Sequence, residues 1–361
     1  MKIVSFETRA VRVAREHAPF AVGGDEIDFV TLKLRTDDGI EGIAYAGFAS
    51  PVLTGALKAT VDGLCGATIG LDAMNTEAVG ARLLRLGGGG SPAGLVTRAA
   101  SAIDVALWDI KGKALGEPVY KLLGGYRDRV PTYASGFLWR SFDLAMLESH
   151  GKRLVAEGFT SMKFRLGAEK TIAAEVARLE TMRGAVGSGV DLMIDINQLW
   201  DVNRAITIGR EMANYGIYWL EDPTTFDDFG GLAKIAHALD TPIAAGEYVY
   251  GIAPFRQLIE LRSIDIVMVD LLRVGGITGW MKVAHMAEAA NLPVVTHLAP
   301  EVLVHALAAV PNGLTVEYMP WSFPLFTWVP PAVDGEIELP QAPGLGLTFD
   351  EAALEAATLA L

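Results

Sequence analysis

Polar or ionisable residues follow a series of short apolar segments in the second half of the chain. They are Lys163 and Arg165, Asp195 and Asn197, Glu221 and Asp222, Glu247, Asp270, His297 and Glu317. A single acidic residue after a strand is usually a helix N-cap or a solvated turn residue, and a single histidine is usually packed in a core. Seven successive segments that all end in this way are too many to be explained by such local roles alone. We therefore interpret the set as a candidate active site.

Three of these carboxylates could form a metal site. Asp195, Glu221 and Glu247 end three consecutive apolar segments. If they converge, they repel one another unless a cation holds them. Oxygen ligands without histidine or cysteine favour Mg²⁺ over zinc. The sequence therefore predicts Mg²⁺ as the cofactor.

The remaining groups suggest acid–base chemistry. Asp270 and His297 end adjacent segments, so the carboxylate could hydrogen-bond the imidazole, fix its tautomer and raise its basicity. Lys163 and Arg165 lie two residues apart on one segment and share a face. A metal, an oriented imidazole and two cations around one cavity predict proton abstraction next to a carboxylate. Together the metal and the cations favour a small anionic substrate.

The apolar segments alternate with amphipathic helical stretches. The segments are PTYASGF (131–137), TSMKFRL (160–166), DLMIDIN (191–197), IYWLEDP (217–223), PIAAGE (242–247), IDIVMVD (264–270), LPVVTH (292–297) and LTVEYM (314–319). Such alternation is typical of a parallel sheet with crossover helices. Eight units in about 190 residues favour a closed barrel, in which the carboxyl ends of all strands surround one mouth. The predicted fold class is therefore α/β.

The first part of the chain has another pattern. DFVTLKLRT (28–36), a TDDG turn (36–39) and IEGIAYAGF (40–48) predict a hairpin that follows a first strand. Residues 53–123 predict helices, with a glycine-rich break at 86–94. Residues 325–361 are proline-rich and then helical, and we expect them to return to the N-terminal part.

Composition excludes several classes of partner. The net charge is −13 and the basic residues form no run, which argues against nucleic acid binding. A single cysteine, Cys65, excludes internal disulfides and a zinc site built on several thiolates. MKIVSFETRAVRVAREH alternates like a strand rather than a signal peptide, and the sequence contains no apolar run of membrane-spanning length. We predict a cytoplasmic protein without membrane or nucleic-acid partners.

Taken together, the motifs resemble the mandelate racemase branch of the enolase superfamily. AIDVALWDIKGKALGEPVYKLLGG (102–125) resembles the segment that joins cap and barrel in this family. MKFR, DINQ, WLEDP, AGE, an aspartate followed by VGGITGW, and THL then follow in the family's order. The resemblance implies a capping α+β domain over 1–125, completed by 325–361, and a modified (β/α)7β barrel over 126–324. It also implies Mg²⁺-dependent abstraction of an α-proton through an enediolate, and a homo-oligomer, from dimer to octamer.

The resemblance also implies roles for particular residues. Asp195, Glu221 and Glu247 would bind the metal, His297 would be the base, Asp270 its partner, and Glu317 a hydrogen-bond donor to the substrate carboxylate. Asn197, Tyr133 and Trp139 are predicted substrate contacts, with packing as the alternative for Trp139. His17 and Phe20 lie in a loop that folds over the active site in this family, with an exposed loop as the alternative.

One departure from the family pattern decides between reactions. Racemases of this branch carry Lys-x-Lys, whereas this chain has Lys163-Phe164-Arg165. Arginine stays protonated and is a poor general base. A single base suits β-elimination, in which His297 removes the C2 proton and then protonates the departing 3-hydroxyl.

We therefore predict a lyase that dehydrates a sugar acid, an aldonate or an aldarate, to a 2-keto-3-deoxy acid. One alternative is an isomerase: a racemase or epimerase with Lys163 as second base, or a cycloisomerase that opens a lactone or anhydro-sugar acid. Another is a catalytically silent protein that binds an anion at the barrel mouth.

Overall fold

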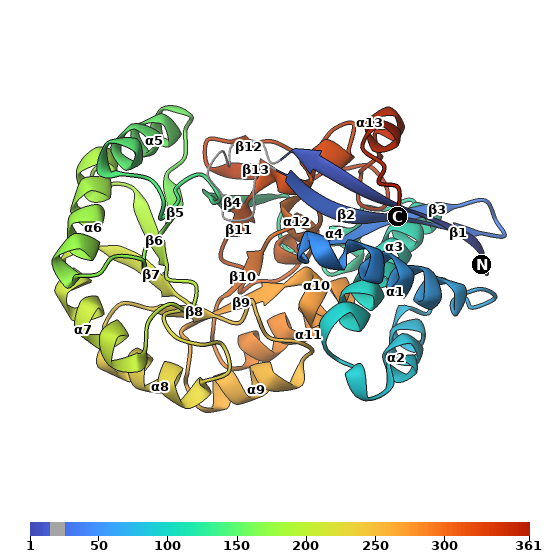
Figure 1. Ribbon diagram of the computed structural model, residues 1–361. Coiled ribbons are helices and arrows are strands. Elements are labelled where there is room, and N and C mark those ends of the chain that lie inside the picture. Colours follow the sequence, from blue (N-terminus) through green and yellow to red (C-terminus); the bar gives the residue numbers. More distant parts are fainter. Residues whose placement is uncertain (15–25) are drawn as a thin grey trace.

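The computed structural model describes residues 1–14 and 26–361. The N-terminal part contains a three-stranded antiparallel sheet in the order β1–β2–β3, with β1 (Ile3–Ala14), β2 (Glu26–Thr36) and β3 (Glu41–Gly47) (Figure 1). The turn between β2 and β3 requires Gly39 at φ +81°, where its N–H donates to the Thr36 carbonyl. The first strand and the hairpin predicted from the sequence are confirmed.

Four helices follow this sheet in the chain. They are α1 (Thr54–Gly66), α2 (Thr76–Leu86), α3 (Gly94–Leu115) and α4 (Val119–Leu122), with short 3₁₀ turns at Pro51–Leu53 and Gly88–Gly90. Of these, α1 and α3 pack on the sheet, and α2 and α4 pack on α3. The longest helix, α3, is buried along most of its length because it packs on β3 on one side and on barrel helices on the other. The glycine-rich stretch interrupts the helices where the sequence predicts a break.

The central part of the chain forms a parallel barrel. Its strands are β4 (Arg129–Ala134), β5 (Ser161–Arg165), β6 (Asp191–Asp195), β7 (Ile217–Glu221), β8 (Ile243–Ala245), β9 (Ile266–Asp270), β10 (Val294–His297) and β11 (Val316–Tyr318). Consecutive strands from β4 to β10 pair in parallel, and β11 pairs with β4. A bridge between Val294 and Gly313 joins β10 to the segment that leads into β11, so the ring of strands closes. The predicted (β/α)7β architecture is confirmed.

Helices connect the barrel strands and lie outside them (Figure 1). They are α5 (Leu144–Ala156), α6 (Ile172–Val186), α7 (Val202–Met212), α8 (Phe229–Ala238), α9 (Ala253–Glu260), α10 (Leu271–Val274), α11 (Gly276–Ala289) and α12 (Pro300–Ala308), with a 3₁₀ turn at Ala213–Tyr215. Asp143, Thr171, Asp201 and Asp228 cap α5 to α8, because each side chain accepts a backbone N–H of the first turn. These polar residues are therefore helix N-caps and are not part of the predicted active site.

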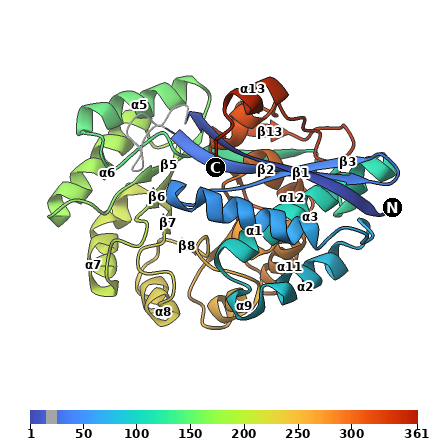
Figure 2. The ribbon, with the colours of Figure 1, turned by 45° about the vertical axis from the view of Figure 1, so that its right-hand side comes forward.

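Residues 320–361 contact both parts of the molecule. After a 3₁₀ helix at Pro320–Leu325, β12 (Ala332–Val333) and β13 (Glu336–Glu338) form a hairpin, and β13 pairs with β4. Beyond α13 (Glu351–Ala356), Leu359 donates to the carbonyl of Ala10, and Arg12 donates to that of Ala357. Figure 2 shows α13 beside the N-terminal sheet. Residues 357–359 thus lie along β1, whereas 332–338 extend the barrel sheet. The domain boundary at residue 125 stays a prediction.

No helix within the described residues is both long and apolar enough to span a bilayer.

A buried histidine on α12 makes the stability of the fold depend on pH. The His305 Nδ1 accepts the Tyr120 N–H at 3.3 Å, and its Nε2 lies 3.0 Å from the Leu345 carbonyl, an arrangement that fits the neutral ring. Burial lowers the pKa of His305 from 6.5 to about 4, although the Leu345 carbonyl opposes this shift. The unfolded chain therefore binds the proton first as the pH falls, and stability is lost between pH 6.5 and 4.

Because of His305, we expect the unfolding free energy to be about 2 kcal/mol lower at pH 5 than at pH 7.5. Urea unfolding of the wild type and of His305→Gln at both pH values tests this, because only the wild type carries the titrating ring. Equal losses of stability in the two proteins would contradict the prediction.

Candidate functional site

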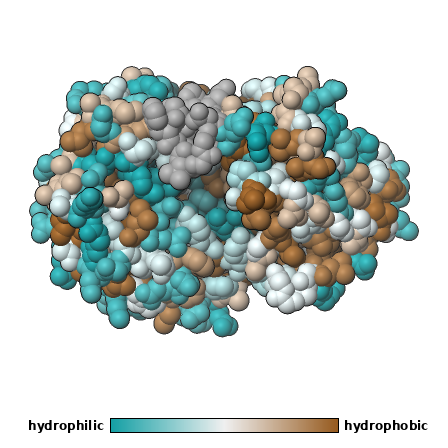
Figure 3. Space-filling view, viewed as in Figure 1, coloured by the Kyte–Doolittle hydropathy of each residue, from teal (hydrophilic) through white to brown (hydrophobic). Residues whose placement is uncertain are grey.

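A cavity of about 400 Å³ lies where the N-terminal part faces the carboxyl ends of the barrel strands. Figure 3 shows a hollow between the two parts of the molecule, with hydrophilic residues on its barrel side. The lining residues include Ile27, Phe48, Arg165, Asn197, Glu247, Tyr248, Arg273, His297, Leu298, Met319 and Trp321. The mouth predicted from the strand ends is therefore covered by the N-terminal sheet and by the 3₁₀ helix after β11.

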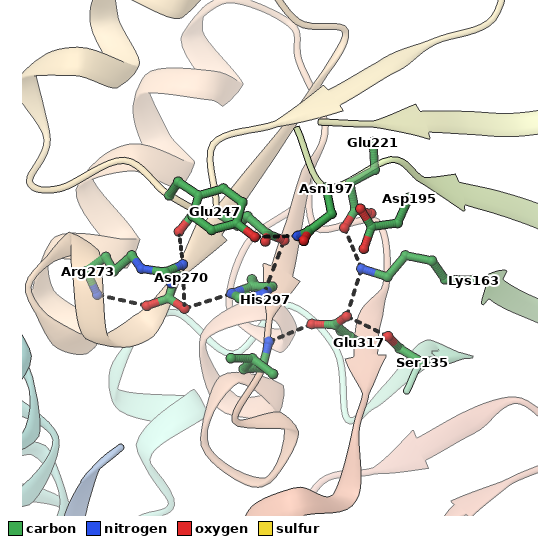
Figure 4. Close-up of polar contacts among 12 residues, drawn as sticks. Ser135, Lys163, Asp195, Asn197, Glu221, Glu247, Asp270, Arg273, His297 and Glu317 are labelled. Carbon is green, nitrogen blue, oxygen red and sulfur yellow. Dashed lines mark hydrogen bonds and ion pairs between the residues drawn. The ribbon is translucent and has the colours of Figure 1, made fainter. Parts of the chain in front are cut away.

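Asp270 holds the imidazole of His297 in this cavity. The carboxylate Oδ2 lies 2.7 Å from His297 Nδ1, and Oδ1 accepts the N–H groups of Leu272 and Arg273 at 2.8 Å each (Figure 4). Asp270 is thus both the N-cap of α10 and the partner of the imidazole. Burial would raise the pKa of Asp270, but Arg273 and His297 outweigh it and lower the pKa. The carboxylate therefore stays ionised beside the ring.

The second nitrogen of His297 faces Glu247. Its Nε2 lies 3.1 Å from Glu247 Oε2. Burial alone would lower the pKa of His297, but the carboxylates of Glu247 and Asp270 raise it. Because Nδ1 donates to Asp270, Nε2 is the nitrogen available to accept a proton.

The three carboxylates predicted to bind Mg²⁺ lie near one another: burial, together with Asp195 and Glu247, raises the pKa of Glu221 although Lys163 opposes the shift. Among the described residues, no three His, Cys, Asp or Glu side chains are grouped as a metal site. Each carboxylate faces a cationic partner instead: Glu221 pairs with Lys163, Asp195 with Arg165 at 3.4 Å, and Glu247 with His297. Pairing with these partners offsets part of the repulsion among the three carboxylates.

Asp195 nevertheless fits a cation. Both of its carboxylate oxygens are buried and accept no hydrogen bond from any residue of the described ranges. The ion pair with Arg165 is the compensation that these oxygens have, and a hard cation is a partner that such carboxylate oxygens prefer. Glu221 ends the strand next to that of Asp195, with Asp195 and Glu221 in register. The donor set is therefore compatible with Mg²⁺.

Lys163 is enclosed by carboxylates. Its ammonium group contacts Glu221 and lies 2.9 Å from Glu317 Oε1. Burial would lower the pKa of Lys163, but the two carboxylates raise it well above its usual value. Lys163 is thus a charged partner of the carboxylates.

Glu317 accepts hydrogen bonds in this structure. Its Oε1 accepts from the Ser135 hydroxyl at 2.7 Å, and its Oε2 accepts from the Leu298 N–H at 2.7 Å. Burial would raise the pKa of Glu317, but Lys163 and His297 lower it to about 2. Glu317 is thus an acceptor in its contacts within the protein, and the donor role toward a substrate carboxylate stays a prediction.

Arg165 lines the cavity, and its guanidinium packs over the ring of Trp139. Its guanidinium carbon lies 4.8 Å from the ring centre of Trp139, and Trp139 stacks on Trp321 with ring centres 6.1 Å apart and an interplanar angle of 8°. Trp139 is buried, and its indole N–H donates to the Gly136 carbonyl. The packing role considered for Trp139 is the one that the structure supports. Trp321, which the sequence analysis did not single out, lines the cavity instead.

Tyr133 lies inside the barrel rather than in the cavity wall. Its side chain is fully buried and meets Trp219 edge-on, with ring centres 5.2 Å apart. It belongs to an apolar layer with Met193, Trp219, Ala244, Ile266, Met268 and Val295. The predicted substrate contact of Tyr133 is therefore wrong: the side chain is part of the core beneath the charged residues.

Asn197 belongs to a polar wall of the cavity. Its amide donates to the Tyr248 hydroxyl, and the Arg273 guanidinium lies 4.9 Å from the centre of the Tyr248 ring. Arg273 also donates to the Glu247 carbonyl at 2.5 Å. Sequence reasoning missed Tyr248 and Arg273, although Tyr248 directly follows a predicted ligand and Arg273 follows Asp270 by one helical turn. The predicted contacts of His17 and Phe20 lie outside the described residues.

Several strand ends adopt left-handed backbone conformations. Asn197, Asp222, Leu298 and Ala299 have φ between +41° and +56° although none is glycine. Such conformations cost free energy and persist where the surroundings impose them, often at functional sites. They lie directly after β6, β7 and β10, where the predicted site residues gather.

A closed parallel barrel with charged residues at the carboxyl ends of its strands is the arrangement of barrel enzymes. Residues 146–353 match the family described as enolase C-terminal domain-like. Residues 5–124 match the N-terminal domain of the mandelate racemase / muconate lactonizing enzyme family. The chain belongs to this enzyme family.

Relatives of known activity are similar over most of the chain. The L-talarate/galactarate dehydratase of Salmonella typhimurium is 33% identical over 91% of this chain and 82% of its own length. The 3,6-anhydro-alpha-L-galactonate cycloisomerase of Streptomyces coelicolor is 33% identical over 90% of each chain. The crystal structure of L-talarate dehydratase from a Polaromonas species, complexed with Mg and L-glucarate, has a TM-score of 0.92 and 31% identity, and covers 99% of this chain and 98% of its own.

Proposed function

We propose that this protein is a Mg²⁺-dependent lyase that dehydrates a sugar acid, an aldonate or an aldarate, to a 2-keto-3-deoxy acid. One observation carries the proposal: His297, oriented by Asp270, faces the cavity, whereas Lys163 is buried in two ion pairs. The site therefore offers one base of suitable basicity. Similarity to dehydratases of sugar acids supports the same reaction.

The chemistry follows from the two nitrogens of His297. Nε2 accepts the proton as the C2–H bond of the substrate breaks, while Asp270 stabilises the resulting imidazolium through Nδ1. The imidazolium then donates this proton to the 3-hydroxyl as the C3–O bond breaks, so that water leaves. The enol that remains takes a proton at C3 and becomes the 2-keto-3-deoxy acid. No oxidant or reductant is required.

We further propose that Asp195, Glu221 and Glu247 hold Mg²⁺. The buried oxygens of Asp195, which accept no hydrogen bond within the described residues, and the all-oxygen donor set support this assignment. The similar Polaromonas structure was crystallised with Mg. When bound, the cation would stabilise negative charge on the carboxylate of the substrate. Lys163 and Arg165 would balance the charge of the three ligands.

A cycloisomerase is the second candidate. The similarity to the Streptomyces enzyme over nine-tenths of both chains favours it. The same base would act, and the leaving group would be a ring oxygen instead of a hydroxyl. A racemase needs a second base, and the ion pairs of Lys163 disfavour that role.

A screen of acid sugars and their lactones for 2-keto products tests the proposal. In D₂O we expect water loss and a product that carries deuterium at C3 with a single stereochemistry. An analogue without the 3-hydroxyl should at most exchange its α-proton with retention, because only His297 returns the proton. Inversion at C2 as fast as exchange would make Lys163 a second base and favour the isomerase.

Binding of acid sugars without turnover of any of them would instead support the anion-binding alternative. The homo-oligomeric state and the cytoplasmic location stay predictions, and sizing chromatography measures the former.

A further inference from the structure

A buried carboxylate next to the cavity connects three segments that are distant in sequence. Glu301 lies in the first turn of α12 and is 1% exposed. Its Oε1 accepts the hydroxyl of Tyr45 on β3 at 2.6 Å, and its Oε2 accepts the hydroxyl of Ser322 at 2.9 Å. Because Tyr45 and Ser322 are also buried, this carboxylate is satisfied by hydroxyl groups within the protein interior.

Each of the three segments carries a residue of the cavity wall. Phe48 follows Tyr45 by three residues, Trp321 precedes Ser322, and Leu298 precedes Glu301 by three residues. The ring of Tyr45 packs edge-on against Phe48, with ring centres 6.2 Å apart. Glu301 therefore fixes the positions of three walls relative to one another, although it is not part of the lining itself.

The segment between His297 and Glu301 requires such an anchor. Leu298 and Ala299 have φ of +56° and +47°, and α12 begins directly after them at Pro300. Left-handed non-glycine residues persist only where neighbouring contacts impose the conformation. Within the same turn, the Leu298 N–H donates to Glu317 and the His297 ring faces the cavity. A change in this turn would therefore move His297 relative to its substrate.

We propose that Glu301 is a positioning residue: by holding Tyr45 and Ser322 it seats the N-terminal sheet on the barrel and keeps the turn that presents His297 in its working conformation. It acts through His297 and has no contact with the reacting atoms. The proposal rests on the proposed function to the extent that its effect on turnover is measured with an acid sugar.

Four variants test this role. Tyr45→Phe removes one donor and keeps the ring, Glu301→Ala removes the anchor, and Glu301→Gln keeps its shape and can bond both hydroxyls after they rotate. Asp109→Asn is the matched control, because Asp109 is an equally buried carboxylate that joins β3 to residue 345 through Ile43 and Leu345. None of these partners lines the cavity within the described residues.

A small displacement of a catalytic group can cost about 100-fold in rate. We expect kcat to fall by about 10- to 100-fold in Tyr45→Phe and Glu301→Ala, with little change in KM, and to recover largely in Glu301→Gln. Asp109→Asn should lower the melting temperature and leave kcat unchanged. If Tyr45→Phe, or Glu301→Ala where it folds, loses only thermal stability, as the control does, the proposal is wrong.

A readout without substrate separates the two proposals. Spectra of ¹⁵N-labelled histidine report the protonation of Nδ1 and Nε2, and His297→Asn assigns the His297 signals. We expect these signals to change in Tyr45→Phe and Glu301→Ala but not in Asp109→Asn. If the wild type turns over no acid sugar, the proposed function fails, and these spectra alone decide the role of Glu301. Unchanged His297 signals in both variants would then overturn it.

Discussion

Replacing His297 with asparagine is expected to abolish turnover. The imidazole is the basic group that Asp270 orients within the cavity, and asparagine neither accepts a proton at neutral pH nor returns one to a leaving hydroxyl. General acid–base catalysis contributes about 10²- to 10⁴-fold, and since one group serves both steps we expect a loss near the upper end, about 10⁴-fold in kcat. Turnover and exchange of the α-proton with D₂O should disappear together.

His305→Gln is the matched control for this variant. His305 is the other fully buried histidine of the described chain, and its contacts are with Tyr120 and Leu345 rather than with the cavity. It should change stability and leave kcat at the wild-type value. Wild-type exchange in His297→Asn would place the base elsewhere, with Lys163 as the first candidate.

Removal of the metal, or of one of its proposed ligands, should have an effect of similar size. Glu221→Gln replaces an anionic ligand with a neutral amide and leaves Lys163 with Glu317 as its carboxylate partner. Loss of residues that only support metal ligands costs about 10- to 100-fold in metal affinity, so a direct ligand should cost at least about 100-fold. Calorimetric titration with Mg²⁺ measures this affinity without any substrate.

Chelation provides the complementary test. Treatment with EDTA should abolish turnover of the wild type, and Mg²⁺ should restore it. Asp104→Asn is the control for Glu221→Gln, because Asp104 is a buried carboxylate on α3 whose partner is Thr278 rather than a residue of the cavity. Full activity in exhaustively chelated protein would contradict the requirement for a metal. An unchanged Mg²⁺ affinity in Glu221→Gln would show that Glu221 is not a ligand.

Much of the fold and the place of the site could be predicted from local sequence patterns. Alternation over 28–36 and 40–48 defines the hairpin, and apolar segments at regular intervals define the barrel strands. Because the carboxyl ends of parallel strands share one face, the position of each polar residue in its segment was enough to bring Asp270 and His297 together.

Depth within the barrel could not be read from the same patterns. Lys163 and Arg165 share a face of β5, but a strand rises about 3.3 Å per residue, so Arg165 lies roughly 7 Å nearer the mouth. Arg165 therefore lines the cavity, whereas Lys163 is enclosed by Glu221 and Glu317. The same difference places Tyr133 in the interior layer and Ser135 at Glu317. Alternation along a strand decides which face a side chain points to. Its height along the barrel axis also depends on how neighbouring strands are staggered.

The hairpin of β12 and β13 was missed although it carries a signal. Asp334 and Gly335 both have positive φ, as a two-residue hairpin turn requires, and Asp-Gly is a favoured sequence for it. The flanking strands have only two and three residues, so the alternation that identifies longer strands is absent. Their pairing with β4 is a long-range contact that local patterns do not contain.

The contact of residues 357–359 with β1 covers part of a strand edge that could otherwise pair with other chains. β1 is an outer strand of its sheet, and an exposed strand edge invites pairing with other chains. The hydrogen bonds of Ala10 and Arg12 to this late segment cover part of that edge. Because residues 357–359 are synthesised after the entire barrel, this part of the edge is uncovered while the barrel strands are made. Protection of this part of β1 against intermolecular pairing is thus acquired only after every barrel strand has been synthesised.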